Sequence, residues 1–362
     1  MEGLLQIVTG QTLADKLSRP SRKVLDYVPI SALPALPGRP PDLAPRQEKP
    51  PAFRELLARE DAVSHGRILH HFANHELQAI ELSAVALLRY PTAPREYRLE
   101  LLSVLLDEQR HLRLYLQRMA ELGVVFGELP LSFHFWKSLH DLPDFRTFIC
   151  AMNLTFEQAN LDFALEYRCL FHRRRDFATA RILSRVLHDE IRHVSHGLCH
   201  FAASSENLWA SYRKHLPEHL SPIRARGTVF SRAVRRRAGF DEEYIDTLFL
   251  FSDSRGRRPT VYHFNPPARG RLRNILTEDY GLLMSLLAAA DDVVLHGPVR
   301  REFLLESRER GLHNCRFATV GELDRIPGRY VPFEHNQQSL LMIEQLKKFA
   351  GFQSHTPVFD SR

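Results

Sequence analysis

Two copies of the pattern Asp-Glu-x-Arg-His lie 82 residues apart in this chain, at 107–111 and 189–193. Residues three apart on an α-helix leave the same face, so the Glu and His of each copy can bind one common partner. A single Glu-x-x-His occurs in many helices by chance, but two copies with the same flanking Asp and Arg are far less accidental. The pattern predicts two long helices that face each other in one bundle.

The region around both copies has the pattern of four helices. From about 51 to 201, glycines are few and apolar residues recur at spacings of three and four, the period of an amphipathic helix. Breaks at 90–94, 123–143 and 172–176 interrupt this pattern. Four long helices with two short turns and one longer connection are typical of a four-helix bundle.

Each of the other two helices should then supply a carboxylate, and on the first helix two residues compete. In an antiparallel hairpin, residues at equal height are equally far from the turn. Glu76 and Glu108 have their midpoint at residue 92, inside the break at 90–94. Glu81 would shift the site by roughly 4 Å along the helix axis, so the geometry favours Glu76.

In the second hairpin, the same geometry favours Glu157 over Glu166 as the carboxylate level with Glu190. Glu157 and Glu190 have their midpoint inside the break at 172–176, whereas Glu166 would be displaced much further. The alternative is that these residues are surface charges of a long-helix bundle. That alternative explains any single Glu well, but it explains six residues at matched heights poorly. The predicted metal ligands are Glu76, Glu108, His111, Glu157, Glu190 and His193. The nearby histidines are expected to support the ligands, or to lie in the core or on the surface, rather than to bind metal themselves: His65, His70, His71, His75, His188 and His196.

The chemistry of this set requires cations. Four carboxylates buried together repel one another strongly unless positive charge compensates them. Two divalent ions resolve this, and four carboxylates with two imidazoles suit two irons, or an iron–manganese pair, better than zinc. Asp107 and Asp189 are expected to accept the free N–H of the ligating histidine from the neighbouring helix. Glu76 and Glu157 are also expected to take part in catalysis.

Outside the bundle the composition changes. Eight prolines in 29–51 exclude a helix there, because each ring removes an amide donor, and predict an extended arm. After 216, short β-branched runs alternate with helical patterns, which favours a small parallel α/β unit. Its expected strands are 260–264, 291–295 and 316–320, and its expected helices are 271–289, 299–310 and 336–350. The predicted domains are a proline-rich N-terminal arm (1–55), a four-helix di-metal bundle (56–215), a basic connector (216–240) and a small α/β domain (241–362).

The net charge of +6 is unevenly placed. Residues 221–275 hold twelve Arg against five acidic residues, a local charge of +7, so the rest of the chain sums to −1. This segment is either a solvated connector or a surface that binds phosphate or carboxylate groups, RNA among them. Aromatic residues interleaved for RNA binding are sparse, which disfavours nucleic acid. The densest cluster, and the candidate for binding an anion or a partner, is Arg235, Arg236 and Arg237.

Several classes of protein are excluded. No apolar run approaches the roughly 18 to 20 residues of a membrane-spanning helix, so no membrane association is expected. The first residues lack the basic and apolar regions of a secretion signal, which predicts a cytoplasmic protein. The four cysteines form no C-x-x-C pair and therefore predict neither a disulfide framework nor a thiolate metal site.

The bundle resembles the ferritin-like di-iron carboxylate superfamily in the order and spacing of its six predicted ligands. The phrases 75–81 (HELQAIE) and 107–115 (DEQRHLRLY), with 10–16 (GQTLADK) and 38–40 (GRP), resemble more narrowly a bacterial ferritin-like family of uncharacterised function. That family is related to the tRNA 2-methylthio-isopentenyladenosine hydroxylases. The resemblance covers about 5–205 and implies a di-iron centre that activates O2, but it does not settle the substrate.

The C-terminal part resembles the small α/β domain that precedes an ATP-grasp fold, in 260–267 and in 291–295 followed by a helix. No G-x-x-x-x-G-K-[ST] motif is present, so no ATP chemistry is predicted. This domain is expected to act as a lid, a docking surface or part of a substrate pocket.

The expected function is that of an O2-dependent di-iron oxidase or monooxygenase, a mainly α cytoplasmic oxidoreductase that acts on an unidentified small-molecule or natural-product-type substrate. An external electron donor, such as a partner protein or reductase, is compatible with this chemistry. The alternatives are a hydroxylase of a modified tRNA nucleoside, a ferroxidase that handles iron, and a scaffold without metal that only binds a partner.

Overall fold

The computed structural model describes residues 2–20, 33–46, 48, 50–201, 207–251, 260–265, 282–288, 292–297, 299–310, 315–322, 329–333, 337–346 and 353–354. The chain divides into two compact units, Met1–Ile245 and Asp246–Arg362. The first unit is helical, and the second combines helices with a small sheet, so the predicted fold class is confirmed.

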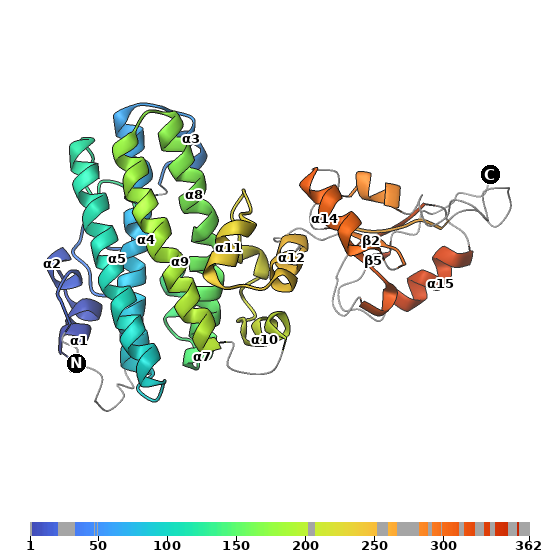
Figure 1. Cartoon of the computed structure of the whole chain (residues 1–362), viewed down its shortest axis with the longest axis horizontal. Coiled ribbons are helices and arrows are strands. Elements are labelled where there is room, and N and C mark those ends of the chain that lie inside the picture. The colour runs from blue at the N-terminus through green and yellow to red at the C-terminus, as the bar shows by residue number, and fades with distance from the viewer. Residues whose placement is uncertain are drawn as a thin grey trace. The chain divides into compact units, whose positions relative to one another are not determined.

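Four long helical segments run side by side in the first unit (Figure 1). The third is continuous through three stretches, because the α-helix α7 passes into a π-helix and then into α8. The breaks between the segments fall where the sequence pattern predicts them, and the long connection contains the short helix α6 (His134–Leu139). The bounds are α4 (Ala62–Arg89), α5 (Arg95–Glu121), α7 (Phe145–Ala151), the π-helix (Met152–Glu157), α8 (Gln158–Arg173) and α9 (Phe177–Phe201).

Aspartates fix the starts of three of these segments. The side chain of Asp61 accepts a hydrogen bond from Ser64 N, and that of Asp144 accepts one from Thr147 N. Asp176 accepts one from Thr179 N at the start of α9. Each carboxylate satisfies an amide that has no partner inside its helix, which fixes where the helix begins and hence which residues face the core.

The N-terminal region packs on the bundle through buried charges. It contains α1 (Glu2–Thr9) and α2 (Leu13–Lys16), which the sequence pattern had not indicated, and α3 (Phe53–Leu57), which lies at the start of the region with the helical pattern. Residues 33–46 form no helix or strand, as expected of the proline-rich stretch. Glu81 of α4 is fully buried and pairs with Lys16 at 3.2 Å and with Arg39 at 2.6 Å. This ion cluster fastens the arm to the bundle.

The segment after α9 is folded against the bundle, whereas 216–240 was expected to be a connector. Asp162 of α8 accepts hydrogen bonds from the amides of Gly227 and Ser231 and from the guanidinium of Arg235. The density of arginine in the sequence does not reveal such a buried partner. This segment contains α10 (Leu208–His215), a 3-10 turn (Pro222–Ala225), α11 (Arg232–Ala238) and α12 (Glu242–Leu250).

The second unit is built on a five-stranded parallel sheet in the order β3-β2-β1-β4-β5. This order, with a reversal between β1 and β4, is that of doubly wound α/β folds. The three predicted strands are present, and β4 and β5 were not predicted. The predicted helix 271–289 lies largely outside the described residues. The elements are β1 (Thr260–His263), β2 (Val293–Leu295), β3 (Arg316–Ala318), β4 (Arg329–Pro332), β5 (Gln353–Ser354), α14 (Arg301–Glu309), α15 (Gln337–Leu346) and 3-10 turns at Met284–Leu286 and Val320–Glu322.

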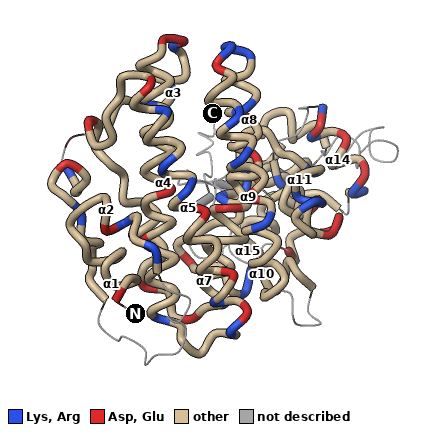
Figure 2. Tube along the Cα trace, turned by 60° about the vertical axis from the view of Figure 1, so that its left-hand side comes forward, with Lys and Arg blue, Asp and Glu red and all other residues tan. Residues whose placement is uncertain are grey.

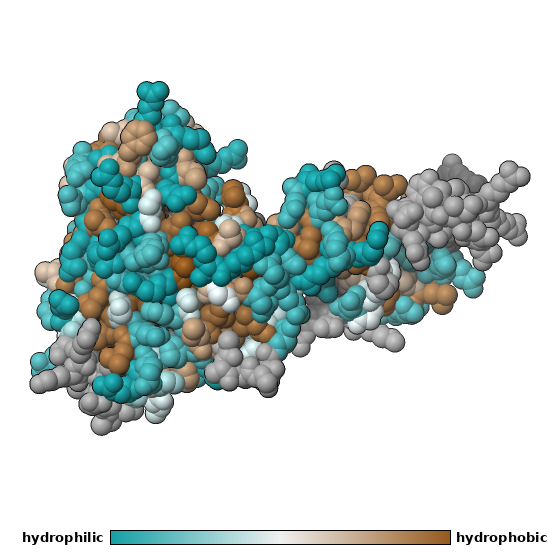
Figure 3. All heavy atoms as spheres, in the orientation of Figure 1, coloured by the Kyte–Doolittle hydropathy of each residue, from teal (hydrophilic) through white to brown (hydrophobic). Residues whose placement is uncertain are grey.

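The surface of the bundle is mainly hydrophilic on the face seen in Figure 3. Basic residues recur along α8 and α9 (Figure 2). Within the described residues, we find no helix with the length and apolar character that crossing a bilayer would require.

Candidate metal centre

The six Glu and His side chains predicted as ligands meet inside the bundle. One Glu comes from α4, one from the end of the π-helix, and a Glu and a His from each of α5 and α9. All six are buried. Their potential ligand atoms form two groups, within each of which all atoms lie within 4.8 Å of one another. The groups are Glu76, Glu108, His111 and Glu190, and then Glu108, Glu157 and His193.

Glu108 belongs to both groups and lies between the two histidines. Its Oε2 is 3.3 Å from Nδ1 of His111, and its Oε1 is 3.1 Å from Nδ1 of His193. The two imidazole centroids are 6.1 Å apart. A carboxylate with one oxygen toward each histidine is placed to bridge two metal ions, each of which would have its own imidazole.

Two buried carboxylate oxygens of the site have no hydrogen-bond donor in the described part of the chain and would be satisfied by a metal ion. Glu157 Oε1 and Glu190 Oε2 are buried without a hydrogen-bond partner among the described residues. Their other oxygens accept hydrogen bonds from Asn153 at 2.6 Å and from Asn160 at 2.7 Å. A buried oxygen without a partner is costly, and a bound cation would remove that cost.

The pKa values show that the cluster needs positive charge. Burial, reinforced by the charge of Glu108, holds the pKa of Glu76 well above its usual range. Burial raises the pKa of Glu157 to about 8. For His111 and His193, burial lowers the pKa, but hydrogen bonds to carboxylates outweigh it and hold both pKa values well above the ordinary range. Without metal the cluster therefore retains protons, the positive charge that metal ions can replace.

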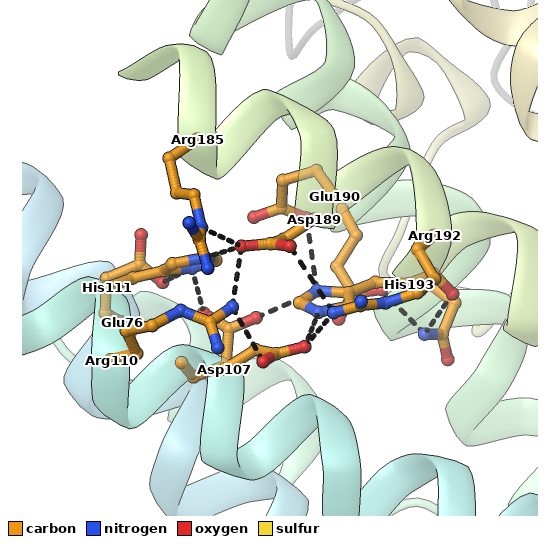
Figure 4. A network of polar contacts seen from close by, with 12 residues as sticks. Glu76, Asp107, Arg110, His111, Arg185, Asp189, Glu190, Arg192 and His193 are labelled. Atoms are coloured by element: carbon orange, nitrogen blue, oxygen red, sulfur yellow. Dashed lines mark hydrogen bonds and ion pairs between the residues drawn. The ribbon is translucent and has the colours of Figure 1, made fainter. Parts of the chain in front are cut away.

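The outer nitrogen of each histidine faces an aspartate of the other motif. Nε2 of His111 lies 3.1 Å from Asp189 Oδ2, and Nε2 of His193 lies 3.3 Å from Asp107 Oδ2. Each contact crosses between α5 and α9 (Figure 4). An aspartate in this position accepts the Nε2 proton and leaves Nδ1 free to bind metal.

Two arginines, to which sequence reasoning assigned no role, join the two aspartates. Arg110 Nη2 lies 2.7 Å from Asp107 Oδ1 and 2.7 Å from Asp189 Oδ2. Arg192 Nη2 likewise contacts both aspartates, and Arg185 reaches Asp189 at 3.6 Å (Figure 4). The signal was present in the sequence, because each motif places its Arg three residues after its Asp on the same helical face.

Glu157 lies at the end of the π-helix, a feature that sequence reasoning missed. Asn153 of this segment donates to Glu157 Oε2 and lies against Gly197 of α9, where a Cβ would come within 2.4 Å of Asn153 Cβ. Thr155 is held from the other side by the hydroxyl of Tyr212, at 2.9 Å. Single π-turns inside α-helices are frequent at functional sites, and this one sets the direction of a candidate ligand.

The alternatives to the six residues lie elsewhere. Glu81 is occupied by Lys16 and Arg39, and Glu166 is in neither group. The six neighbouring histidines also lie outside both groups. His65, for example, contacts Asp176 at 3.1 Å, far along the bundle from the motif residues.

The arginine cluster requires a correction. Arg235 is 0% exposed, and its Nη1 and Nη2 donate to the two oxygens of Asp162 at 2.7 and 2.8 Å. Its guanidinium also lies over the ring of Phe230. Because its donors are used inside the fold, assigning Arg235 to an anion-binding surface was wrong. Arg236 and Arg237 are exposed, and Arg236 is paired with Glu242.

Comparison with known proteins places the chain in a family. No curated protein matches it, and no solved structure matches it. One family model, described as "Protein of unknown function (DUF455)", matches residues 9–246. The match spans more than half of the chain and includes all six Glu and His residues of the candidate centre. The chain therefore belongs to the DUF455 family.

Proposed function

We propose that this protein is an O2-dependent di-iron oxidoreductase. The observation that carries the proposal is the pair of overlapping Glu/His groups that share Glu108. Four carboxylates and two imidazoles are the donor set that suits iron, or an iron–manganese pair, and zinc would favour fewer ligands. Two iron ions bound here would supply the redox chemistry by which O2 is reduced and an organic substrate is oxidised.

The chain's own residues have distinct tasks in this proposal. Glu108 would offer one ligand oxygen on the side of each histidine, and Asp107 and Asp189 fix the tautomers of the two histidines. Glu76 and Glu157 would complete the ligand set from the opposite helices. In the metal-free protein, burial raises the pKa of Glu157 to about 8, so its carboxyl group holds a proton at neutral pH that a bound metal ion would displace.

A group of aromatic rings close to Glu76 and Glu157 in the sequence favours an organic substrate over a ferroxidase role. Rings from α3, α4, α6, the π-helix and α8 contact one another, for example Phe72 with Tyr167 at 5.0 Å and Phe135 with Phe156 at 4.7 Å. Phe72 also lies 6.0 Å from Tyr115, a buried residue two turns beyond Glu108. Rings beside an oxidising centre suit an apolar substrate, whereas iron ions passing through would require polar groups.

Metal analysis followed by reaction with O2 tests the proposal. Protein purified without chelator and reconstituted with Fe(II) under anaerobic conditions should bind close to two irons per chain, and O2 should then change its optical spectrum. Glu108→Ala should lose at least one iron, and Glu166→Ala, a carboxylate outside both groups, should lose none. Wild-type protein that binds a single zinc, or no iron, would contradict the proposal. Release of mineralised ferric iron during turnover would favour the ferroxidase.

A further inference from the structure

Six arginines define the outer surface where α5 and α9 pack together. Within 101–120 and 178–199, the acidic residues on this outer side are Asp107 and Asp189, and both are buried below the arginines. The other two acidic residues of these segments are Glu108 and Glu190 of the metal centre. Arg118 is also paired with Glu121 at 2.7 Å and with Asp176 at 3.0 Å, so six arginines against four acidic residues leave a net charge of +2 on this surface. We call it the arginine face: Arg110, Arg113, Arg118, Arg181, Arg185 and Arg192.

The arginines nearest the centre are accessible from outside. The exposed fractions of their side chains are 58% for Arg185, 42% for Arg192 and 37% for Arg110. A guanidinium has five N–H donors, and the contacts with the aspartates leave several of them available. Exposed guanidinium groups with spare donors bind carboxylates well, so this surface fits an acidic partner.

A short chain of contacts connects this surface to the centre. Arg185 lies 3.6 Å from Asp189, and Asp189 lies 3.1 Å from Nε2 of His111. Nδ1 of the same imidazole lies 3.3 Å from Glu108. Two side chains therefore separate the exposed guanidinium from the candidate ligand atoms. Electron tunnelling falls steeply with distance, so an electron carrier gains most by docking here.

We infer that the arginine face docks a small acidic protein with a one-electron iron–sulfur centre, which reduces the metal centre through Asp189 and His111. The inference rests on the proposed function, because it gives the site the electrons that O2 chemistry needs. Each encounter oxidises one partner cluster by one electron and reduces one Fe(III) to Fe(II). Two encounters reduce both irons, and no covalent bond in either protein changes.

The test uses a plant-type [2Fe–2S] ferredoxin as the acidic probe. Its affinity for metal-free full-length protein is measured by calorimetry from low to high salt, and its rate of reducing the diferric protein is measured by stopped flow. The variants are Arg181→Glu alone and together with Arg185→Glu. The control is Lys137→Glu, which makes the same charge change on α6, an exposed position next to α4. Dithionite serves as a reductant that needs no docking.

We expect salt-sensitive binding and reduction by ferredoxin, both weakened about tenfold or more by the double variant and less by Arg181→Glu. Lys137→Glu should resemble wild type in both measurements, and Arg181→Glu should keep the wild-type rate of reduction by dithionite. Equal affinities and rates in all variants, or rates independent of salt, would overturn the inference while iron binding still supports the di-iron centre. Tight RNA binding lost in the double variant, with ferredoxin reduction unchanged, would overturn it in favour of nucleic acid. Protein that binds no iron would refute the proposed function instead.

Discussion

Asp189 lies 3.1 Å from Nε2 of His111, across the contact between α9 and α5. The equivalent pair, Asp107 and His193, crosses the same contact in the opposite direction. Each helix thus orients the histidine of the other, so the two motifs depend on each other for their geometry. A displacement of α5 relative to α9 would disturb both histidines at once.

Asp189→Asn and Asp107→Asn should fold and retain most of their metal at saturation, but lose roughly 10- to 100-fold in metal affinity. The reason is that an amide can present its NH2 group to Nε2 and no longer favours the tautomer with Nδ1 free. Competition for iron with a chelator of known affinity measures the loss. Ser184→Ala, on the outer face of α9, is the matched control. Wild-type affinity in either Asn variant would remove the orienting role from that aspartate.

Glu76 and Glu81 lie one and a half turns apart on α4 and should respond oppositely to the change Glu→Gln. Glu81→Gln leaves the buried Lys16 and Arg39 without their carboxylate, which should lower the free energy of unfolding by about 3 to 5 kcal/mol and leave two metals bound. Glu76→Gln removes a buried carboxylate whose pKa is raised, so it should lose metal with little loss of stability. Denaturant titration and metal analysis of both variants distinguish the two roles. If Glu81→Gln loses metal and Glu76→Gln does not, then Glu81 is the metal ligand and Glu76 is not.

Much of the bundle could be predicted because its signals are periodic. Helical period and breaks fix which residues share a face and a height, so the meeting of Glu76 with Glu108 follows from counting residues to the turn. The same counting cannot reveal the π-helix. The segment 152–157 is too short for a change of apolar period to be recognised, and the contacts of its residues with Gly197 and Tyr212 join positions far apart in the sequence.

Charge density was a poor guide to function where burial decided the outcome. Arg235 and Arg236 are neighbours in the sequence, yet the first is buried on Asp162 and the second is exposed. Their difference depends on which helical face meets α8 and α9, and a short segment of 232–238 does not show this. In the second unit, β4 escaped prediction because its sequence, Arg-Tyr-Val-Pro, has a single β-branched residue.

Metal affinity should increase with pH through about 8. In the metal-free protein the raised pKa values of Glu76, Glu157, His111 and His193 mean that protons occupy the site at neutral pH, and metal must displace them. Calorimetry in two buffers of different ionisation enthalpy should show proton release on binding, and less release as the pH rises. An affinity that is constant from pH 6 to pH 9 would contradict this.

The stability of the metal-free protein should change with pH in the opposite direction. The pKa of Glu157 has its ordinary value of 4.5 in the unfolded chain but is raised to about 8 in the folded protein, so its contribution to stability is complete below pH 4.5 and is lost as the pH rises through 8. The raised pKa values of the two histidines act in the same direction above 6.5. The melting temperature of metal-free protein should therefore fall between pH 5 and pH 8. Iron-loaded protein should lose this dependence, since the ligands are then ionised throughout.

The π-helix should be essential for metal binding at Glu157. Gly197→Ala would place a Cβ within 2.4 Å of Asn153 Cβ, so the π-helix must shift and the hydrogen bond from Asn153 to Glu157 is lost. We expect one of the two irons to bind at least tenfold more weakly. Tyr212→Phe removes only the hydroxyl contact with Thr155 and should cost about 1 kcal/mol of stability with both irons retained. Full iron affinity in Gly197→Ala would show that the π-helix tolerates displacement.

The segment between the bundle and the sheet should be part of the metal-binding unit. A chain ending at Leu216 lacks Arg235, and therefore leaves Asp162 buried on α8 without its cation. It also lacks Tyr244, whose hydroxyl lies within hydrogen-bond distance, 3.0 Å, of the side-chain amide of Gln158, the residue after Glu157. A buried charge that loses its partner costs about 3 to 5 kcal/mol, so this chain should be much less stable and bind iron poorly.

A chain ending at Leu250 keeps these contacts and should bind two irons with a melting temperature near that of the full chain. The comparison is sharpened by Asp162→Asn together with Arg235→Met in the full chain, which removes both charges and should be tolerated better than either single change. Thermal unfolding and metal analysis of the two truncated chains decide the matter. If the chain ending at Leu216 is as stable and binds as much iron as the one ending at Leu250, then 217–250 is a covering layer with no part in holding Glu157.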